Sequence, residues 1–165
     1  NKLLNFGGNE FNHLDTISFF YVLGLVGNVN PSEFVKKRLK GERILAKDIY
    51  TLDRIFSKLS YMKEEEDLKY MLSRSFSTSP DVMNCVIFPE EIIEVISEMK
   101  SGKIPTSMKD VKIDGNDVIE ISNGRLKEQE VGGILERILR DALMNRFNWK
   151  DRKRSLLYLS NLIYQ

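Results

Sequence analysis

Residues 111–119 read Val111-Lys112-Ile113-Asp114-Gly115-Asn116-Asp117-Val118-Ile119, and residues 131–135 read Val131-Gly132-Gly133-Ile134-Leu135. From Val131 to Leu143, apolar residues recur at alternating steps of three and one, the spacing of one face of an α-helix. The two glycines fall in the first turn of this predicted helix, where backbone N–H groups have no partner within the helix. The glycines therefore predict either a closely packed neighbour or an approaching phosphate.

Three segments of this region resemble the C-terminal part of bacterial-type tRNA nucleotidyltransferases, the CCA-adding enzymes and their poly(A) polymerase relatives. The segments are Ile104-Pro105, residues 109–119 and residues 131–135. The family pattern is roughly I-x-G-x-D-L-I followed by G-P-x-I-G-x-I-L. The sequence matches the first part well and the second part partially, with Glu128-Gln129 at about the place of the first Gly-Pro.

The resemblance implies a protein with a head, a neck, a body and a tail that process the 3′ end of tRNA. The family head uses a glycine-rich loop and two aspartates that hold Mg²⁺, and it takes CTP and ATP. No head motif occurs in this sequence, and Glu66-Asp67-Leu68-Lys69-Tyr70 begins like the family's neck motif but lacks its arginine. The resemblance thus implies a body at 1–103 and a tail at 104–165 that are inactive alone, with tRNA and the protein's own head and neck as partners.

Helical periodicity extends over most of the chain, and signals for strands are nearly absent. The predicted fold is all-α, with a helical body, a smaller helical tail and no substantial sheet. Asp114 is expected to be the N-cap of a short helix and Asp117 an acid in its first turn. The other predicted helices cover about 10–25, 31–41, 46–59, 63–76, 82–88, 89–102 and the residues that follow Trp149.

The composition is that of an ordinary globular protein of one or two small domains, with 165 residues and an apolar fraction of 42%. No run of residues approaches the length and apolarity of a membrane span, and no signal peptide is visible. Because the chain begins at Asn1 and not at Met, we expect a processed or excised piece. Cys85 is the only cysteine, which favours a reducing compartment such as the cytoplasm.

Basic residues gather in two parts of the sequence. Residues 31–58 contain eight basic and four acidic residues, and residues 137–154 contain seven basic and two acidic residues. The middle of the chain is acidic, with four consecutive acids at 64–67. Two basic patches suit a polyanion that touches the protein at separate places, although solvated helix faces of mixed charge would give the same pattern.

Candidate RNA contacts follow from the resemblance and from the charge. One set is expected along the acceptor–T stem, a second near the tRNA elbow, and a third in support of the second. Asn116 could instead be only a turn residue, and the two glycines could instead allow close helix–helix packing. The sets are Lys36, Lys37, Arg38, Lys40 and Arg43; then Lys112, Asn116, Arg125, Lys127, Gly132 and Gly133; then Arg137, Arg152, Lys153 and Arg154.

The sequence offers no set of catalytic or metal-ligating residues. His13 is the only histidine, so His13 and Cys85 cannot supply a four-ligand zinc site. There is no P-loop and no G-x-S-x-G motif. We therefore predict no catalytic residue, metal or cofactor in this chain. The alternative to an RNA-binding region is a helical protein-interaction module that keeps the fold without an RNA role.

Overall fold

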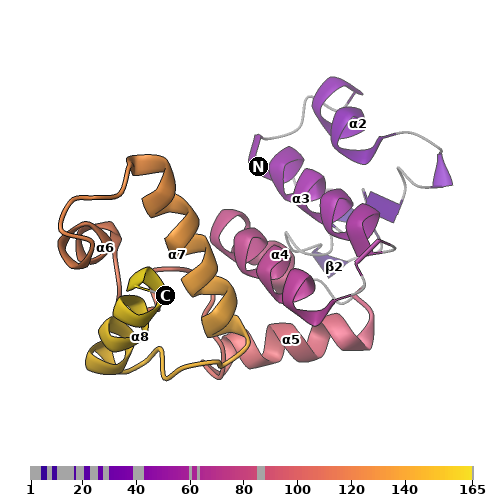
Figure 1. Ribbon diagram of the computed structural model, residues 1–165. Helices are drawn as coiled ribbons and strands as arrows, with labels where there is room; N and C mark the ends of the chain where they lie inside the picture. The colour runs from indigo at the N-terminus through magenta and orange to yellow at the C-terminus, as the bar shows by residue number, and fades with distance from the viewer. Residues whose placement is uncertain are drawn as a thin grey trace. The chain divides into compact units, whose positions relative to one another are not determined.

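The computed structural model describes residues 5–6, 9–10, 17, 21–22, 26–27, 30–38, 43–59, 61–62, 64–84 and 88–164 (Figure 1). The fold is all-α, as the periodicity predicts. Most of the helix predicted at 10–25 lies outside the described residues, together with His13, Lys40 and Cys85. The side chains of Lys36, Lys37 and Arg38 also lie outside them.

The described elements are mostly helices. Two two-residue strands pair antiparallel, with Asn5 opposite Glu10 and Phe6 opposite Asn9. Of the helix predicted at 82–88, residues 82–84 belong to a short 3₁₀-helix that starts at Pro80, and residues 85–87 lie outside the described residues. The elements are β1 (Asn5–Phe6), β2 (Asn9–Glu10), α2 (Pro31–Arg38), α3 (Arg43–Leu59), α4 (Glu65–Thr78), η1 (Pro80–Asn84), α5 (Glu90–Lys100), α6 (Gly115–Ile121), α7 (Glu128–Leu143) and α8 (Arg152–Tyr164).

The chain divides into two compact units. Unit 1 comprises Asn1–Met62 and Ser75–Ile93, and unit 2 comprises Lys63–Arg74 and Glu94–Gln165. Helices α4 and α5 each contribute residues to both units. The division into a body at 1–103 and a tail at 104–165 stays a prediction.

Unit 1 packs α3 against α2 and η1. The apolar stripe predicted for α3 is its buried face, with Ile49, Leu52 and Ile55 fully buried. The ring of Phe56 stacks on Tyr21 and on Phe88 at centroid distances of 5.4 and 5.6 Å. Aromatic pairs at such distances add to the stabilisation that comes from the buried area alone.

Unit 2 is built around α7, which contacts α6, while α6 also contacts α8 (Figure 1). The stripe read from the sequence is the buried face of α7, since Ile138, Ala142 and Leu143 are fully buried. Leu159 of α8 is fully buried as well. No helix in the described part of the chain has the length and apolarity required to cross a membrane.

Local capping fixes where the helices of unit 2 begin and end. The Asp114 side chain accepts the N–H groups of Asn116 and Asp117, and the Asp117 side chain accepts the N–H of Asp114. This reciprocal capping box confirms the roles predicted for both aspartates. Just beyond the end of α7, Asn145 has φ 51° and its N–H donates to the Ala142 carbonyl, while the Arg146 N–H donates to the Asp141 carbonyl.

Candidate nucleic-acid interface

The segment between α5 and α6 is held in place by its own side chains. One carboxylate oxygen of Asp110, Oδ2, accepts hydrogen bonds from the N–H and hydroxyl of Thr106 at 2.7 Å and from the Ser107 N–H at 3.1 Å. Val111 and Ile113 are buried, whereas Lys112 between them is exposed. The alternation of buried and exposed residues therefore presents Lys112 to solvent on an anchored backbone.

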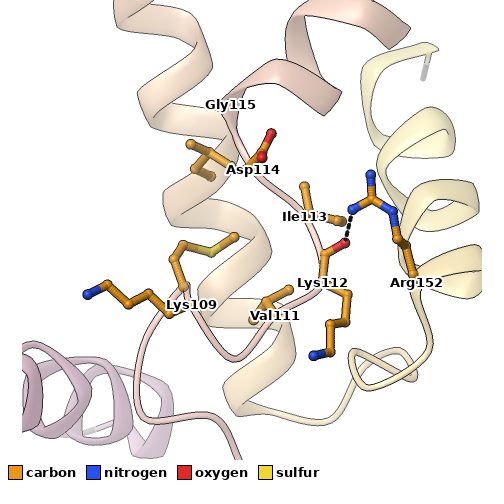
Figure 2. Close-up of a pocket in the computed structure, with 9 residues that line it drawn as sticks. Lys109, Val111, Lys112, Ile113, Asp114, Gly115 and Arg152 are labelled. Atoms are coloured by element: carbon orange, nitrogen blue, oxygen red, sulfur yellow. Dashed lines mark hydrogen bonds between the residues drawn. The ribbon is translucent and has the colours of Figure 1, made fainter.

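Arg152 ties the start of α8 to this segment. Its guanidinium donates to the Lys112 carbonyl at 2.8 Å, and to the two carboxylate oxygens of Asp117 at 2.7 and 3.2 Å. Figure 2 shows Arg152 reaching across to Lys112 from the neighbouring helix. The Asp117 side chain is 8% exposed, so this bidentate pair stabilises the packing of α8 on α6.

A hollow of about 430 Å³ lies along this segment (Figure 2). Its wall carries three cationic side chains, from Lys109, Lys112 and Arg152, and one carboxylate, from Asp114. The Asp114 carboxylate is occupied by the N–H groups of α6 that it caps. Within the described residues, neither the Lys109 nor the Lys112 ammonium group forms an ion pair. The hollow is therefore a cationic surface.

Arg125 and Lys127 lie in the connection between α6 and α7, and both are exposed. Neither pairs with a carboxylate in the part of the chain that the structure describes. Asn116 is exposed in the first turn of α6. Glu130 stands beside these residues, and its Oε2 accepts the Lys127 N–H at 2.7 Å, so its carboxylate serves as a helix cap.

The two glycines do not have the bare amides that the sequence predicts. Helix α7 begins at Glu128, three residues earlier than the apolar pattern indicates. Gly132 and Gly133 are therefore its fifth and sixth residues, beyond the four N–H groups that a helix leaves unpaired. Close packing does not explain them either, because both are exposed and a Cβ atom on either would meet nothing within 4 Å.

The glycine pair gives a prediction about stability. Replacing Gly132 and Gly133 by alanine is expected to raise the free energy of unfolding by roughly 0.5–1 kcal/mol for each residue, since alanine loses less backbone entropy in a helix. Thermal unfolding of the double variant measures this. A lower Tm than that of the unaltered chain would contradict the open helix face at these positions.

Several other cations are held by acids of unit 2. Arg140 lies 2.9 Å from Asp67, and Arg146 lies 2.7 Å from Glu66. Glu66 and Asp67, the first two residues of the stretch that resembles the neck motif, thus form ion pairs at the start of α4. Arg140 also covers the face of the Tyr70 ring, at 4.1 Å from its centroid.

Asp141 is the buried centre of this ion-pair cluster. Its side chain is fully buried and accepts from Arg137 at 3.0 Å, from the Tyr158 hydroxyl at 2.8 Å and from Arg146. Burial acts to raise the pKa of Asp141, but hydrogen bonds from Arg146, Tyr158 and Arg137 outweigh it and lower the pKa. Burial, followed by the bond to Asp141, raises the pKa of Tyr158 to about 12.

The predicted RNA contacts accordingly fall into groups. Arg137 and Arg152 have internal partners, so each offers less net attraction to a phosphate than an unpaired cation does. Lys153 and Arg154 are exposed in the first turn of α8. In unit 1, Arg43 is exposed as the first residue of α3, and Lys36, Lys37 and Arg38 belong to α2.

One cation of the hollow was missed by the sequence-based selection. Lys109 lies in the segment that resembles the family, but net charge by region gave it no weight, because it stands outside both basic patches. Alternation alone would place Lys109 on the buried side with Val111 and Ile113. Its side chain is exposed because residues 108–110 form a turn, which the sequence pattern does not predict.

No protein-family model, curated protein or solved structure matches this chain. Among the described residues, no group of three or more histidine, cysteine, aspartate or glutamate side chains is arranged to hold a metal ion.

Proposed function

We propose that this chain is an RNA-binding region that grips the acceptor–T arm and the elbow of a tRNA. Its parent activity is that of a tRNA nucleotidyltransferase that adds or repairs the 3′-terminal CCA. The observation that carries the proposal is the set of exposed cations on an anchored backbone, in the stretch with the family-like sequence. Lys112, Arg125 and Lys127 stand there without carboxylate partners among the described residues.

The chemistry required for such a grip is modest. Double-helical RNA presents phosphates, 2′-hydroxyls and a shallow minor groove, and proteins recognise it mainly by shape and charge. Lysine and arginine side chains neutralise phosphates and release the counterions that surround them. A helical scaffold with outward cations suits this role without reactive groups of its own.

Catalysis belongs, in this proposal, to a head outside the present residues. That head supplies the site for Mg²⁺ and for CTP or ATP, and this chain alone is inactive. A tRNA ligand also implies a cytoplasmic protein. Unit 1 contributes the α2–α3 cations to the acceptor–T stem, and unit 2 contributes the α6–α7 cations to the elbow.

A salt titration of tRNA binding tests the proposal. The logarithm of the binding constant should fall linearly with the logarithm of salt concentration, with a slope near −0.9 for every phosphate contacted. A slope of several units supports an RNA clamp. Absence of salt-sensitive binding contradicts it.

A second candidate function is a helical protein-interaction module with no RNA role. It is favoured by the ion pairs that occupy Arg137, Arg140 and Arg146, since these arginines account for much of the charge in the second basic patch. A stable protein partner together with no salt-sensitive RNA binding selects this alternative.

A further inference from the structure

A second hollow, of about 450 Å³, lies beside the first in unit 2. Four lysines line it, from the end of α5, the anchored segment and the turn before α8. Asp110 and Trp149 also line it. The lysines are Lys100, Lys109, Lys112 and Lys150.

The single carboxylate in this wall is already engaged. Asp110 accepts three hydrogen bonds from Thr106 and Ser107 through Oδ2, so it serves the backbone of the segment. Lys100 has an interaction partner, but Lys109, Lys112 and Lys150 form no ion pair within the described residues, so the wall brings three unpaired positive charges together. Mutual repulsion disfavours such a cluster of like charges unless an anion screens it.

The backbone around the hollow is fixed at each side. Helix α5 ends in a turn at Gly102, with φ 70°, whose N–H donates to the Met99 carbonyl, while the Lys103 N–H donates to Glu98. This satisfies carbonyls that would otherwise repel an anion. On the opposite side, Trp149 is buried, with 7% of the residue exposed, and its indole N–H donates to the Asn145 side-chain oxygen at 3.2 Å.

Lys150 places its ammonium nitrogen 5.1 Å from the centroid of the Trp149 ring. The indole face thus holds one of the four cations at the wall. Trp149 is the only tryptophan of the chain, so its fluorescence reports on this hollow alone.

We propose that this hollow binds a phosphate group through Lys109, Lys112 and Lys150. The proposal rests on the proposed function only for the source of that phosphate, which is the backbone of the bound RNA. The same chemistry admits a free phosphate or pyrophosphate ion. Ammonium groups on flexible stems suit phosphate oxygens, which accept several charge-assisted hydrogen bonds at once.

Pyrophosphate and Trp149 fluorescence test the site without RNA. The expected result is a saturable fluorescence change at constant ionic strength, because the anion draws the Lys150 ammonium from the indole face. In a Lys109→Ala/Lys112→Ala double variant, the apparent Kd should rise about tenfold or more. Both side chains are exposed, so an unchanged Tm is expected to show that the variant folds.

Lys103→Ala is the matched control. Lys103 is exposed in the same segment and does not line the hollow, so its variant should keep the pyrophosphate affinity within about twofold. A wild-type protein with no saturable response overturns the site. So does a Lys103→Ala variant that weakens binding as much as the double variant.

Titration with tRNA identifies the source of the phosphate. The double variant should bind tRNA with a salt slope that is smaller in magnitude by about two than that of the wild type. The Lys103→Ala variant should keep the wild-type slope. If pyrophosphate binds and tRNA does not bind the wild type, the site stands with a free anion and the proposed function fails. If tRNA binds both proteins equally and pyrophosphate gives no response, the function stands and the site is overturned. If pyrophosphate binds and tRNA binds both proteins equally, the RNA backbone is excluded as the source.

Discussion

The Asp141→Ala variant is expected to lose about 3 kcal/mol of its free energy of unfolding, a large share of the stability of a small protein. Asp141 is fully buried in α7 and holds Arg137, Arg146 and Tyr158 together. Its removal leaves the Tyr158 hydroxyl without its acceptor and opens a space in the core of unit 2. Removing one partner of a buried ion pair typically costs about 3–5 kcal/mol of stability. We expect the lower end of that range, because Arg137 and Arg146 are partly exposed to solvent. Urea denaturation at pH 7 measures the loss.

Glu128→Ala is the matched control for this variant. It removes a carboxylate from the same helix, but Glu128 is exposed, so the expected change lies within about 0.5 kcal/mol. Equal effects of the two variants would contradict the structural role of Asp141.

The pH dependence gives Asp141 a second signature. Its pKa in the folded protein lies below the ordinary value of 3.8, so its contribution to stability is present above that value and is lost as pH falls through the folded pKa. The difference in stability between the unaltered chain and Asp141→Asn should therefore be largest near neutral pH. It should narrow only below about pH 4.

The second large effect is expected for RNA binding. A triple variant, Lys112→Ala/Arg125→Ala/Lys127→Ala, should bind tRNA about a hundredfold more weakly at moderate salt, with a salt slope reduced by roughly three. All three side chains are exposed, and no carboxylate of the described residues pairs with them. Filter binding over a range of salt concentrations measures both quantities.

A charge-preserving variant, Lys112→Arg/Arg125→Lys/Lys127→Arg, serves as the control. Phosphate contacts by point charges tolerate this exchange better than bidentate base contacts do, so most of the affinity should remain. A triple alanine variant that binds tRNA as tightly as the unaltered chain would contradict the α6–α7 interface.

Local features of the fold were predictable from the sequence. The alternating steps from Val131 to Leu143 gave the buried face of α7, and the Asp114–Asp117 pair gave the cap of α6. The start of α7 was missed because Lys127 is not among the residues that favour an N-cap position. The bond from Lys127 to Glu130 nevertheless starts the helix there and moves both glycines into its hydrogen-bonded part.

Long-range ion pairs could not be predicted from the sequence. Arg140 and Arg146 meet acids more than seventy positions earlier in the chain, and Arg152 meets Asp117 thirty-five positions earlier. A count of charges along the chain treats these arginines as available, whereas the folded chain pairs them. The same count gave no weight to Lys109, which becomes part of a cationic hollow only through folding.

Competition between an intact tRNA and a linear, unstructured RNA of the same length tests most directly whether packed helices with separate cationic surfaces recognise a folded RNA. At equal salt, we expect the tRNA to bind at least about tenfold more tightly, because proteins recognise folded RNA by shape as well as by charge, whereas the linear RNA offers charge alone. Equal affinities for the two RNAs would contradict that recognition, whatever their absolute strength.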